Sequence, residues 1–592
     1  MFVHLFRLKF LCYLFCLLVV SLSMPVFASP SSVEVTVDGV RGKKKKNIVS
    51  ALGLAPGLVR DGKVDLHWLH RFVDQVPGLA EQALEPFGYY RSEIETNFQE
   101  TDEVYLINVQ VTPGVPVRVR QLSLRLTGAG SGKSELKQEL RLFPLKKGDI
   151  LRHKFYDKGK IALQRKAIDL GYLDAVYTSA SVKVYPDEDA ADIELVLDTG
   201  ACYRFGPVSF DGDLDFFDAS FLQRFIPFAE GEVFSHRLLH RSRLSFYQAD
   251  RFDEVLMVPR IDEAEDLKVP IDVKLVPGKR HRLRPGVGYG TDTGARVSLN
   301  YQDTRPFNRP DLYSFEALLA EKTEFLENSY TIPQAGSSEN NFIISFGLRN
   351  EDIGVYETRI AYTEIEEVYS LGVGKTGSFY LRYSREDGDI SDASFVSYLL
   401  TPGVRYYQRS YDDPLNPRKG YQFRLELRGN HDELLSDVTF GQILGAGSFI
   451  LPLNSRFTLH VRAEAATTIK DDEFSDIPVS MRFFVGGDSS VRGYSFNSRG
   501  PRNSDGDVIG GDSKLVGSVE LEYSLNDKWG LAVFYDTGSA FNAVAGNIKY
   551  INGAGVGVRR YTLIGPIKLD LASRVGDSNN SMRIHLSVGF DI

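Results

Sequence analysis

The chain has 592 residues, which is too many for one ordinary domain, and 43% of them are hydrophobic. The formal net charge of −9 argues against nucleic acid or an anionic lipid surface as the main partner. After residue 30 no apolar run approaches the roughly 20 residues that a membrane helix needs, which excludes a helical membrane protein. A membrane β-barrel is not excluded, because its strands alternate apolar and polar side chains.

Residues 1–28 are typical of a signal peptide. A basic start precedes an apolar stretch at residues 10–24, and Val26-Phe27-Ala28 offers small residues at a cleavage site. A short anchor helix is the alternative interpretation. The two cysteines of this segment leave with a cleaved peptide, so Cys202 has no intrachain partner and the exported chain cannot depend on disulfides.

The next part of the chain carries a pattern of helix and strand that repeats three times. Each repeat is predicted to contain a strand, two helices and two strands, and to end in a tight turn before a basic strand start. The turn glycines are Gly114, Gly200 and Gly278, and Gly88 and Gly171 stand where a helix end needs positive φ. We predict modules at 29–115, 116–202 and 203–280. Such a module exposes a sheet edge that can accept a client strand, or it acts as a rigid spacer.

From residue 281 to residue 592 we predict an antiparallel barrel of sixteen strands. Helical periodicity disappears, and segments such as YQFRLELRGN (421–430) place apolar and charged residues on opposite faces. A spacing of roughly 19–20 residues per strand and loop suits tilted membrane strands of ~9–11 residues. A soluble β-sandwich also alternates, but the regular spacing, the charges of both signs on one face and the final strand favour a membrane barrel.

The first and last strands of this barrel are predicted to meet at a weak seam. In LRPGVGYGTDTG (283–294), Gly286, Gly288 and Gly290 occupy every inward position, and the last strand carries Gly589. Glycine offers no side chain for packing and weakens a strand, so a client strand can enter there. The alternative is that these glycines only relieve crowding at the mouth of the barrel.

A long loop at residues 488–513 follows the strand end MRFFVGG (481–487). It contains Val491-Arg492-Gly493-Tyr494. Alternation in the next two strands points Phe534, Asp536 and Gly538 of an F-x-D-x-G segment, and also Glu522, into the lumen. Because a guanidinium binds carboxylates through two parallel bonds, we expect Arg492 to fold back and pair with Asp536 and Glu522. A solvent-exposed loop is the alternative, and Arg499 and Arg502 have no assigned role.

The VRGY loop followed by F-x-D-x-G resembles the outer-membrane assembly superfamily that contains BamA, TamA and the two-partner secretion transporters. The resemblance implies POTRA domains (periplasmic modules), a lumen contact of Arg492 with Asp536 and Glu522, and an outer-membrane location in a Gram-negative bacterium. Three modules, with RFFVGGDSSVRGY and GPIKLD (565–570), look most similar to the TamA branch. That branch implies a TamB-like partner anchored in the inner membrane and clients that are unfolded outer-membrane proteins such as autotransporters.

No pattern in the sequence predicts catalysis. The pairs His67–His70 and His236–His240 lack a third ligand nearby, and neither a nucleophile motif nor a phosphate loop is found, so we expect no metal, cofactor or enzyme activity. The expected function is outer-membrane protein assembly through the periplasmic modules and the lateral seam. A dedicated secretion transporter and a passive porin-like channel are the alternatives. The basic run at 43–46 has no assigned role.

Overall fold

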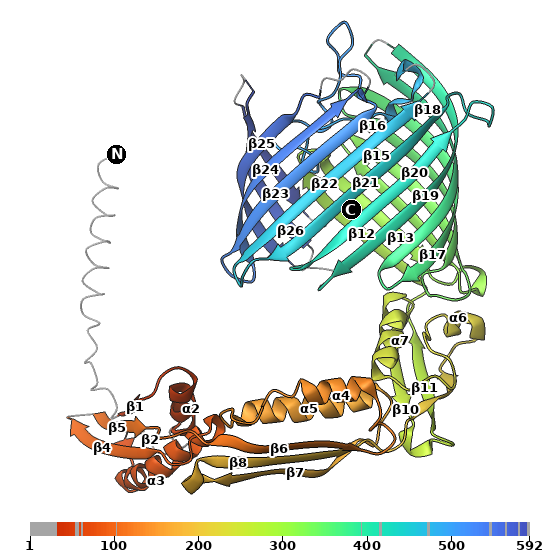
Figure 1. Ribbon diagram of the computed structural model, residues 1–592. Coiled ribbons are helices and arrows are strands. Elements are labelled where there is room, and N and C mark those ends of the chain that lie inside the picture. Colours follow the sequence, from red (N-terminus) through yellow and green to blue (C-terminus); the bar gives the residue numbers. More distant parts are fainter. Residues whose placement is uncertain are drawn as a thin grey trace, which may run out of the picture. The chain divides into compact units, whose positions relative to one another are not determined.

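A computed structural model describes residues 32–588 except 54–58, 61–62, 102–103, 392, 414–416, 471–473, 544–547, 563–564 and 578–580. The predicted signal peptide at 1–28 and the seam residue Gly589 lie outside the described residues. Within them, no helix has both the length and the apolarity that crossing a membrane demands. The predicted fold class is confirmed: α/β modules precede a closed antiparallel barrel of sixteen strands (Figure 1).

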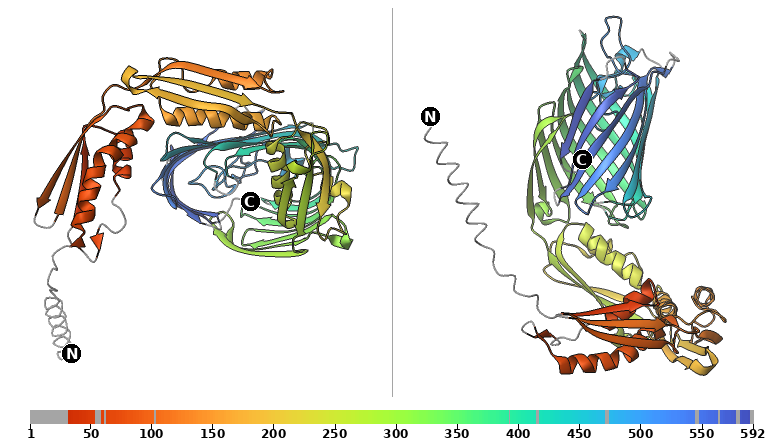
Figure 2. Two further views of the ribbon diagram at one scale, coloured as in Figure 1. Left: turned by 90° about the horizontal axis from the view of Figure 1, so that it is seen from below. Right: turned by 90° about the vertical axis from the view of Figure 1, so that its left-hand side faces the viewer.

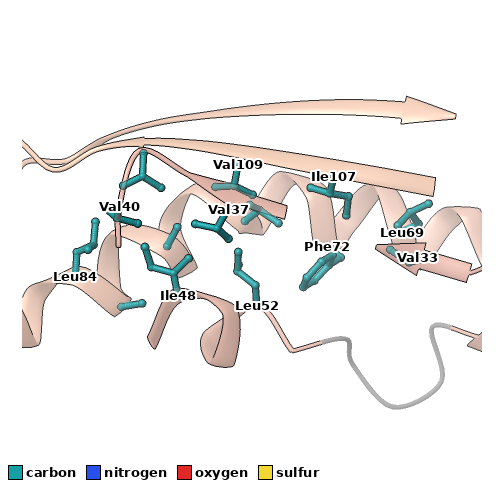
Figure 3. Packing of buried hydrophobic residues seen from close by; sticks show 14 residues of the cluster. Val33, Val37, Val40, Ile48, Leu52, Leu69, Phe72, Leu84, Ile107 and Val109 are labelled. Carbon is teal, nitrogen blue, oxygen red and sulfur yellow. The ribbon is translucent and has the colours of Figure 1, made fainter. Parts of the chain in front are cut away.

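The first module folds around a three-stranded sheet in the order β1-β5-β4, in which β1 is parallel to β5. Asp65 caps α3 by accepting hydrogen bonds from two backbone N–H groups. Aliphatic side chains of α2 and α3, such as Ile48 and Leu69, pack against sheet residues such as Ile107 of β5 (Figure 3). The elements are β1 (Ser32–Asp38), α2 (Lys43–Ala51), β2 (Val59–Arg60), β3 (Lys63–Val64), α3 (Leu66–Leu84), η1 (Glu85–Phe87), β4 (Glu93–Thr101) and β5 (Val104–Thr112).

The second and third modules repeat this plan. Their sheets run β6-β8-β7 and β10-β11-β9. Gly88 and Gly171 have φ of 91° and 89°, the positive values predicted for these helix ends. The second module contains β6 (Arg118–Thr127), α4 (Ser134–Arg141), α5 (His153–Asp169), β7 (Val176–Tyr185), η2 (Pro186–Glu188) and β8 (Ala190–Asp198). The third contains β9 (Arg204–Asp211), α6 (Ala219–Gln223), α7 (His236–Gln248), β10 (Phe252–Pro259), η3 (Ile261–Glu263) and β11 (Lys268–Pro277).

Each barrel strand pairs antiparallel with the next, and the last returns to the first. The strands are β12 (His281–Gly290), β13 (Gly294–Asp303), β14 (Leu312–Ala320), β15 (Thr323–Pro333), β16 (Asn341–Asp352), β17 (Tyr356–Gly372), β18 (Lys375–Ile390), β19 (Ala393–Tyr411), β20 (Gly420–Asn430), β21 (Phe440–Pro452), β22 (Phe457–Lys470), β23 (Ser513–Ser524), β24 (Trp529–Phe541), β25 (Ile551–Thr562), β26 (Gly565–Val575) and β27 (Met582–Val588). Short 3-10 turns are η4 (Pro306–Asn308), η5 (Phe474–Asp476) and η6 (Val479–Met481).

The barrel has an apolar outside and a charged inside. On β20, Phe423 and Leu427 are exposed on the outer face, whereas Glu426 is buried and accepts a hydrogen bond from the Tyr380 hydroxyl. Arg405 of β19 pairs with Glu364 of β17, across β18, on the same inner face. Because this sheet closes on itself and buries charge rather than a second apolar sheet, the sandwich interpretation does not apply.

Candidate functional site

The segment between β22 and β23 forms a lid inside the barrel, and we use this name for residues 474–512 (Figure 2). The prediction of a strand at 481–487 is wrong, because β22 ends at Lys470. Phe483 and Val485 make only isolated bridges, to Gly511 and Arg499 within the lid. Both side chains are buried, since the lid is enclosed by the barrel and has no lipid-facing side.

Arg492 of the lid is joined to Asp536 of β24. Its Nε lies 2.8 Å from Asp536 Oδ2 and its Nη2 lies 2.9 Å from Asp536 Oδ1, the two parallel bonds that a guanidinium makes to a carboxylate. The backbone N–H of Arg492 also donates to Asp536, at 3.1 Å. The guanidinium carbon stands 3.4 Å from the centre of the Phe534 ring, a cation–π contact. Two residues of the F-x-D-x-G segment therefore hold this one arginine.

Two more carboxylates complete the surroundings of Arg492. Its Nη1 lies 2.8 Å from Glu520 Oε2 and 3.0 Å from Asp570 Oδ2. Arg559 of β25 bridges the same two carboxylates from the other side. Three acids and two arginines thus form one network; Asp536 is fully buried and Arg492 is 6% exposed.

The network keeps the lid arginine charged. Burial by itself would lower the pKa of the Arg492 guanidinium, but its hydrogen bonds to Asp536 and two further carboxylate charges raise that pKa above its ordinary value. Such an enclosed ion network gives little net stability over an apolar core, but removing one member leaves the others uncompensated. The network therefore fixes the position of the lid.

Glu522 does not contact Arg492, which corrects the predicted pairing. Its carboxylate accepts hydrogen bonds from the Tyr561 hydroxyl at 2.8 and 2.7 Å and lies 3.3 Å from His460. Glu520 and Glu522 both point inward, because side chains alternate along β23. Alternation selects the face of a strand but not the height along it, and the arginine sits at the height of Glu520.

Glycines on the wall make room for the lid. A Cβ on Gly553 would stand 2.0 Å from the Arg492 carbonyl oxygen, and one on Gly538 would stand 2.9 Å from a Val491 methyl carbon. Gly493 has a φ of 96°, which lets the chain turn directly after the arginine. The final glycine of F-x-D-x-G is therefore needed for close approach of the lid, as Asp536 is needed for its charge.

The other two arginines singled out in the sequence, Arg499 and Arg502, belong to the lid itself. Tyr494 is buried, and the guanidinium carbons of Arg499 and Arg574 lie 5.2 and 4.9 Å from the centre of its ring. Arg502 forms a bridge with Val508 and donates to the Gly506 carbonyl, so it closes a turn at the exposed tip. Arg499 thus packs against Tyr494 within the lid, whereas Arg502 shapes the outer end of the lid.

The seam between β12 and β27 has one ladder pair among the described residues, Gly290 with Ser587. The described part of β27 ends at Val588, one residue beyond this pair, whereas β12 pairs with β13 over its whole length, from His281 opposite Asp303 to Gly290 opposite Gly294. The glycines of β12 have a local role as well. A Cβ on Gly286 would stand 2.4 Å from Ser298 Oγ, and one on Gly288 would stand 2.8 Å from Arg296 Nε.

Residues that sequence reasoning missed are Glu520, Asp570, Arg559 and a cluster at the seam. Asp292, Asp488 and His585 bring their ligand atoms within 4.8 Å of one another. Strand alternation could have assigned Asp570 and His585 to the inner face, but no spacing links the turn after β12, the lid and β27. Ion networks of this kind bind and position chain segments.

Comparison with known families and proteins supports this architecture. The Omp85 superfamily domain matches residues 278–592, and the POTRA domain TamA domain 1 matches residues 34–113. The outer membrane protein assembly factor BamA of Nitratidesulfovibrio vulgaris is 25% identical over 400 residues, which cover 64% of this chain and 49% of that protein. BamA of Neisseria meningitidis serogroup B is 22% identical over 527 residues, which cover 78% of this chain and 63% of that protein.

The chain thus spans about half to somewhat under two thirds of the length of these relatives. The crystal structure of BamA from Haemophilus ducreyi lacking POTRA domains 1–3 superposes with a TM-score of 0.59 at 17% identity. That superposition covers 79% of this chain and 99% of the other, and it shows the shared fold. Because the Omp85 match extends over more than half of its residues, the chain belongs to the Omp85 superfamily, as an outer-membrane β-barrel with periplasmic POTRA domains.

Proposed function

We propose that this protein assembles other outer-membrane proteins by admitting their strands at the seam between β12 and β27. The observation that carries the proposal is the composition of β12, in which Gly286, Gly288 and Gly290 leave few side chains to pack along the edge that it shares with β27. Polar backbone groups in lipid must be paired, so the edges of β12 and β27, once apart, would favour pairing with the strand of an unfolded barrel protein. The curated relatives named above are outer membrane protein assembly factors, which supports the same conclusion.

The driving force in this proposal needs no nucleotide and no catalytic group. A client strand gains backbone hydrogen bonds from β12 or β27, and its apolar face leaves water for lipid at about 25 cal/mol per Å². Exposed apolar side chains on both seam strands, Val287 and Ile584 among them, extend the lipid-facing surface to the edge where such a strand arrives. The protein therefore acts as a template and not as an enzyme.

The lid supports assembly over a passive porin-like channel. Val491, Arg492 and Tyr494 of the lid are buried inside the barrel, so the lumen is not an open pore. A dedicated secretion transporter remains the second alternative, and it shares this barrel type. In our proposal the network around Arg492 holds the lid as a latch while the seam exchanges partners.

At a finer level, we infer that the protein acts in the manner of TamA, with a TamB-like inner-membrane-anchored partner and autotransporters among its clients. The support is the TamA-type match over residues 34–113 and the presence of three modules. Each module sheet has two edge strands, such as β1 and β4 in the first, that can take an added strand. Photo-crosslinking from residues of β4 in intact envelopes tests the partner. Capture of a periplasm-spanning protein is expected, and capture of client chains alone contradicts it.

A disulfide across the seam tests the assembly proposal. Gly290→Cys with Ser587→Cys joins directly opposed residues in a Cys202→Ser background, a separation suited to a disulfide. The oxidised protein in lipid vesicles is expected to lose at least about tenfold of its client insertion rate, and reduction restores it. The control is Ser329→Cys with Ser345→Cys, which locks the fully paired strands β15 and β16. Full activity of the locked seam contradicts lateral entry.

A further inference from the structure

Three segments that are far apart in the sequence meet at the seam through Asp292, Asp488 and His585, which we call the clasp. Asp292 lies in the turn between β12 and β13, Asp488 in the lid, and His585 in β27. The Asp488 backbone N–H donates to Asp292 Oδ2 at 2.6 Å, and His585 Nδ1 contacts the Asp488 carboxylate. The clasp therefore links the first strand to the last through the lid, in addition to the backbone pairing of Gly290 with Ser587.

One oxygen of the clasp lacks a hydrogen-bond partner. Asp292 is 8% exposed, and among the described residues its Oδ1 accepts no hydrogen bond and is shielded from solvent. The Asp488 carboxylate beside it carries the same charge and is stabilised by His585 and weakly by the Thr291 hydroxyl at 3.3 Å. A shielded carboxylate oxygen without a donor is costly when ionised, and a proton on it removes the charge.

The histidine geometry distinguishes a proton from a metal ion at this site. His585 Nε2 accepts a hydrogen bond from the Gly493 N–H at 2.9 Å, so that nitrogen carries a lone pair and the ring proton is on Nδ1, facing Asp488. A metal bound at Nδ1 would require a proton on Nε2, where the Gly493 N–H already points. His585 therefore offers no nitrogen to a metal ion, and the site fits a proton instead.

We propose that the clasp is a proton-binding lock on the seam, in which protonation of Asp292 holds β12, the lid and β27 together and ionisation releases them. The inference rests on the proposed opening of the seam. Another charged group near Asp292 is Arg583 of β27, whose Nη1 donates to Ser495 Oγ. The charges of His585 and Arg583 lower the pKa of the Asp292 carboxyl, but by less than burial and the charge of Asp488 raise it.

The sign of the pH dependence follows from Asp292. Burial, and then the charge of Asp488, raise the pKa of the Asp292 carboxyl to about 6, against an ordinary value of 3.8 in the opened, solvated state. The closed seam thus holds the proton up to a higher pH than the open seam does. Lowering the pH from about 6 towards about 4 favours closure, and above about 7 the ionised pair favours opening.

Distances between spin labels at Val287→Cys and Ile584→Cys report the state of the seam, because both side chains face outward on β12 and β27. The measurement uses the full chain with Cys202→Ser in lipid nanodiscs at pH 7.5 and pH 5.0. Because the pKa of Asp292 is about two units higher in the closed seam than in the open one, the ratio of open to closed seam is expected to fall roughly tenfold from pH 7.5 to pH 5.0. Asp292→Asn, which mimics the protonated acid, is expected to give the low open fraction at both pH values.

The control is Glu386→Gln, a buried carboxylate of β18 that accepts hydrogen bonds from Ser480 of the lid away from the seam. It is expected to retain the pH response of the parent. If Asp292→Asn does not insert, Asp488→Asn replaces it, and a weaker pH response is expected because the repelling charge is gone.

Four outcomes overturn the proposal. An open population that does not change with pH contradicts the lock but leaves lateral entry intact. A pH response that persists in Asp292→Asn assigns the titration to another group. Closure of the parent at pH 7.5 by Zn²⁺, reversed by EDTA, would make the ligand a metal ion. A seam that stays closed at both pH values and in the presence of client contradicts both the lock and the proposed function. The seam disulfide assay then tests the proposed function separately from the lock.

Discussion

The lid is attached to the barrel at two places that differ in completeness. On the wall formed by β23 to β26, Arg492 is surrounded by three carboxylates and a ring, and Arg559 balances the same acids. At the seam, the lid offers Asp488 to His585 and Asp292, and one buried oxygen there has no donor among the described residues. In our proposal the lid is therefore fixed on the wall of β23 to β26 and released at the seam.

The largest expected effect comes from Arg492→Ala, which removes the fixed attachment. Breaking one member of a buried ion network typically costs about 3–5 kcal/mol, because the remaining charges stay desolvated. We expect hydrogen exchange of residues 488–500 to rise and client insertion to fall at least roughly tenfold, with a smaller change in unfolding of the barrel. The control is Arg359→Ala, an exposed arginine paired with Glu357 on β17. If the lid amides of Arg492→Ala keep their exchange protection, Arg492 is not the fixed attachment of the lid.

The network also sets the outcome of a charge reversal. In Arg492→Asp with Asp536→Arg, the new aspartate faces Glu520 and Asp570, which repel it. We expect little recovery of insertion relative to Arg492→Asp alone. Strong recovery would mean that Asp536 is the dominant partner and that the other two acids contribute little.

A second test compares neighbouring acids on one strand face. Glu520→Gln removes a charge that binds both Arg492 and Arg559, so it is expected to destabilise the lid by about 1–3 kcal/mol. Glu522→Gln affects Tyr561 and His460 instead, and the lid is expected to keep its exchange protection. Exchange rates of lid amides measure both. Equal effects of the two variants would contradict the observed pairing.

Space under the lid gives a third test. In Gly553→Ala the new methyl group would meet the Arg492 carbonyl oxygen at 2.0 Å, which forces the lid away at a cost of about 1–3 kcal/mol. Gly517→Ala is the matched variant on β23, because its nearest neighbour would be 3.7 Å away. Thermal unfolding and insertion assays of the pair are expected to show a defect in Gly553→Ala alone.

The smallest expected effect concerns the ring of Tyr494. Arg499→Ala removes one of two guanidiniums near that ring, a contact worth about 0.5–1 kcal/mol, and Arg574 remains in place. Arg502→Ala at the exposed tip is expected to change lid exchange less still. A larger effect from Arg502 than from Arg499 would shift the important part of the lid to its outer turn.

The sequence was informative wherever local patterns repeat. Alternation predicted the barrel, its sixteen strands and the inward face of Phe534 and Asp536, because the pleat of a strand sends successive side chains to opposite sides. It failed at 481–487, where apolar residues imitate a strand although they are buried on all sides within the lid. A buried irregular segment and a strand can share a composition, and only their surroundings differ.

By itself the sequence determined the succession of three α/β modules and a barrel, because periodicity and turn residues are local properties. The tertiary structure alone decided which acid receives Arg492, since Glu520 and Glu522 share one face and only the height of the folded lid separates them. It also decided that Asp292, Asp488 and His585 meet, because barrel closure brings the first turn beside the last strand. Contacts between segments hundreds of residues apart depend on that closure, and no local pattern encodes it.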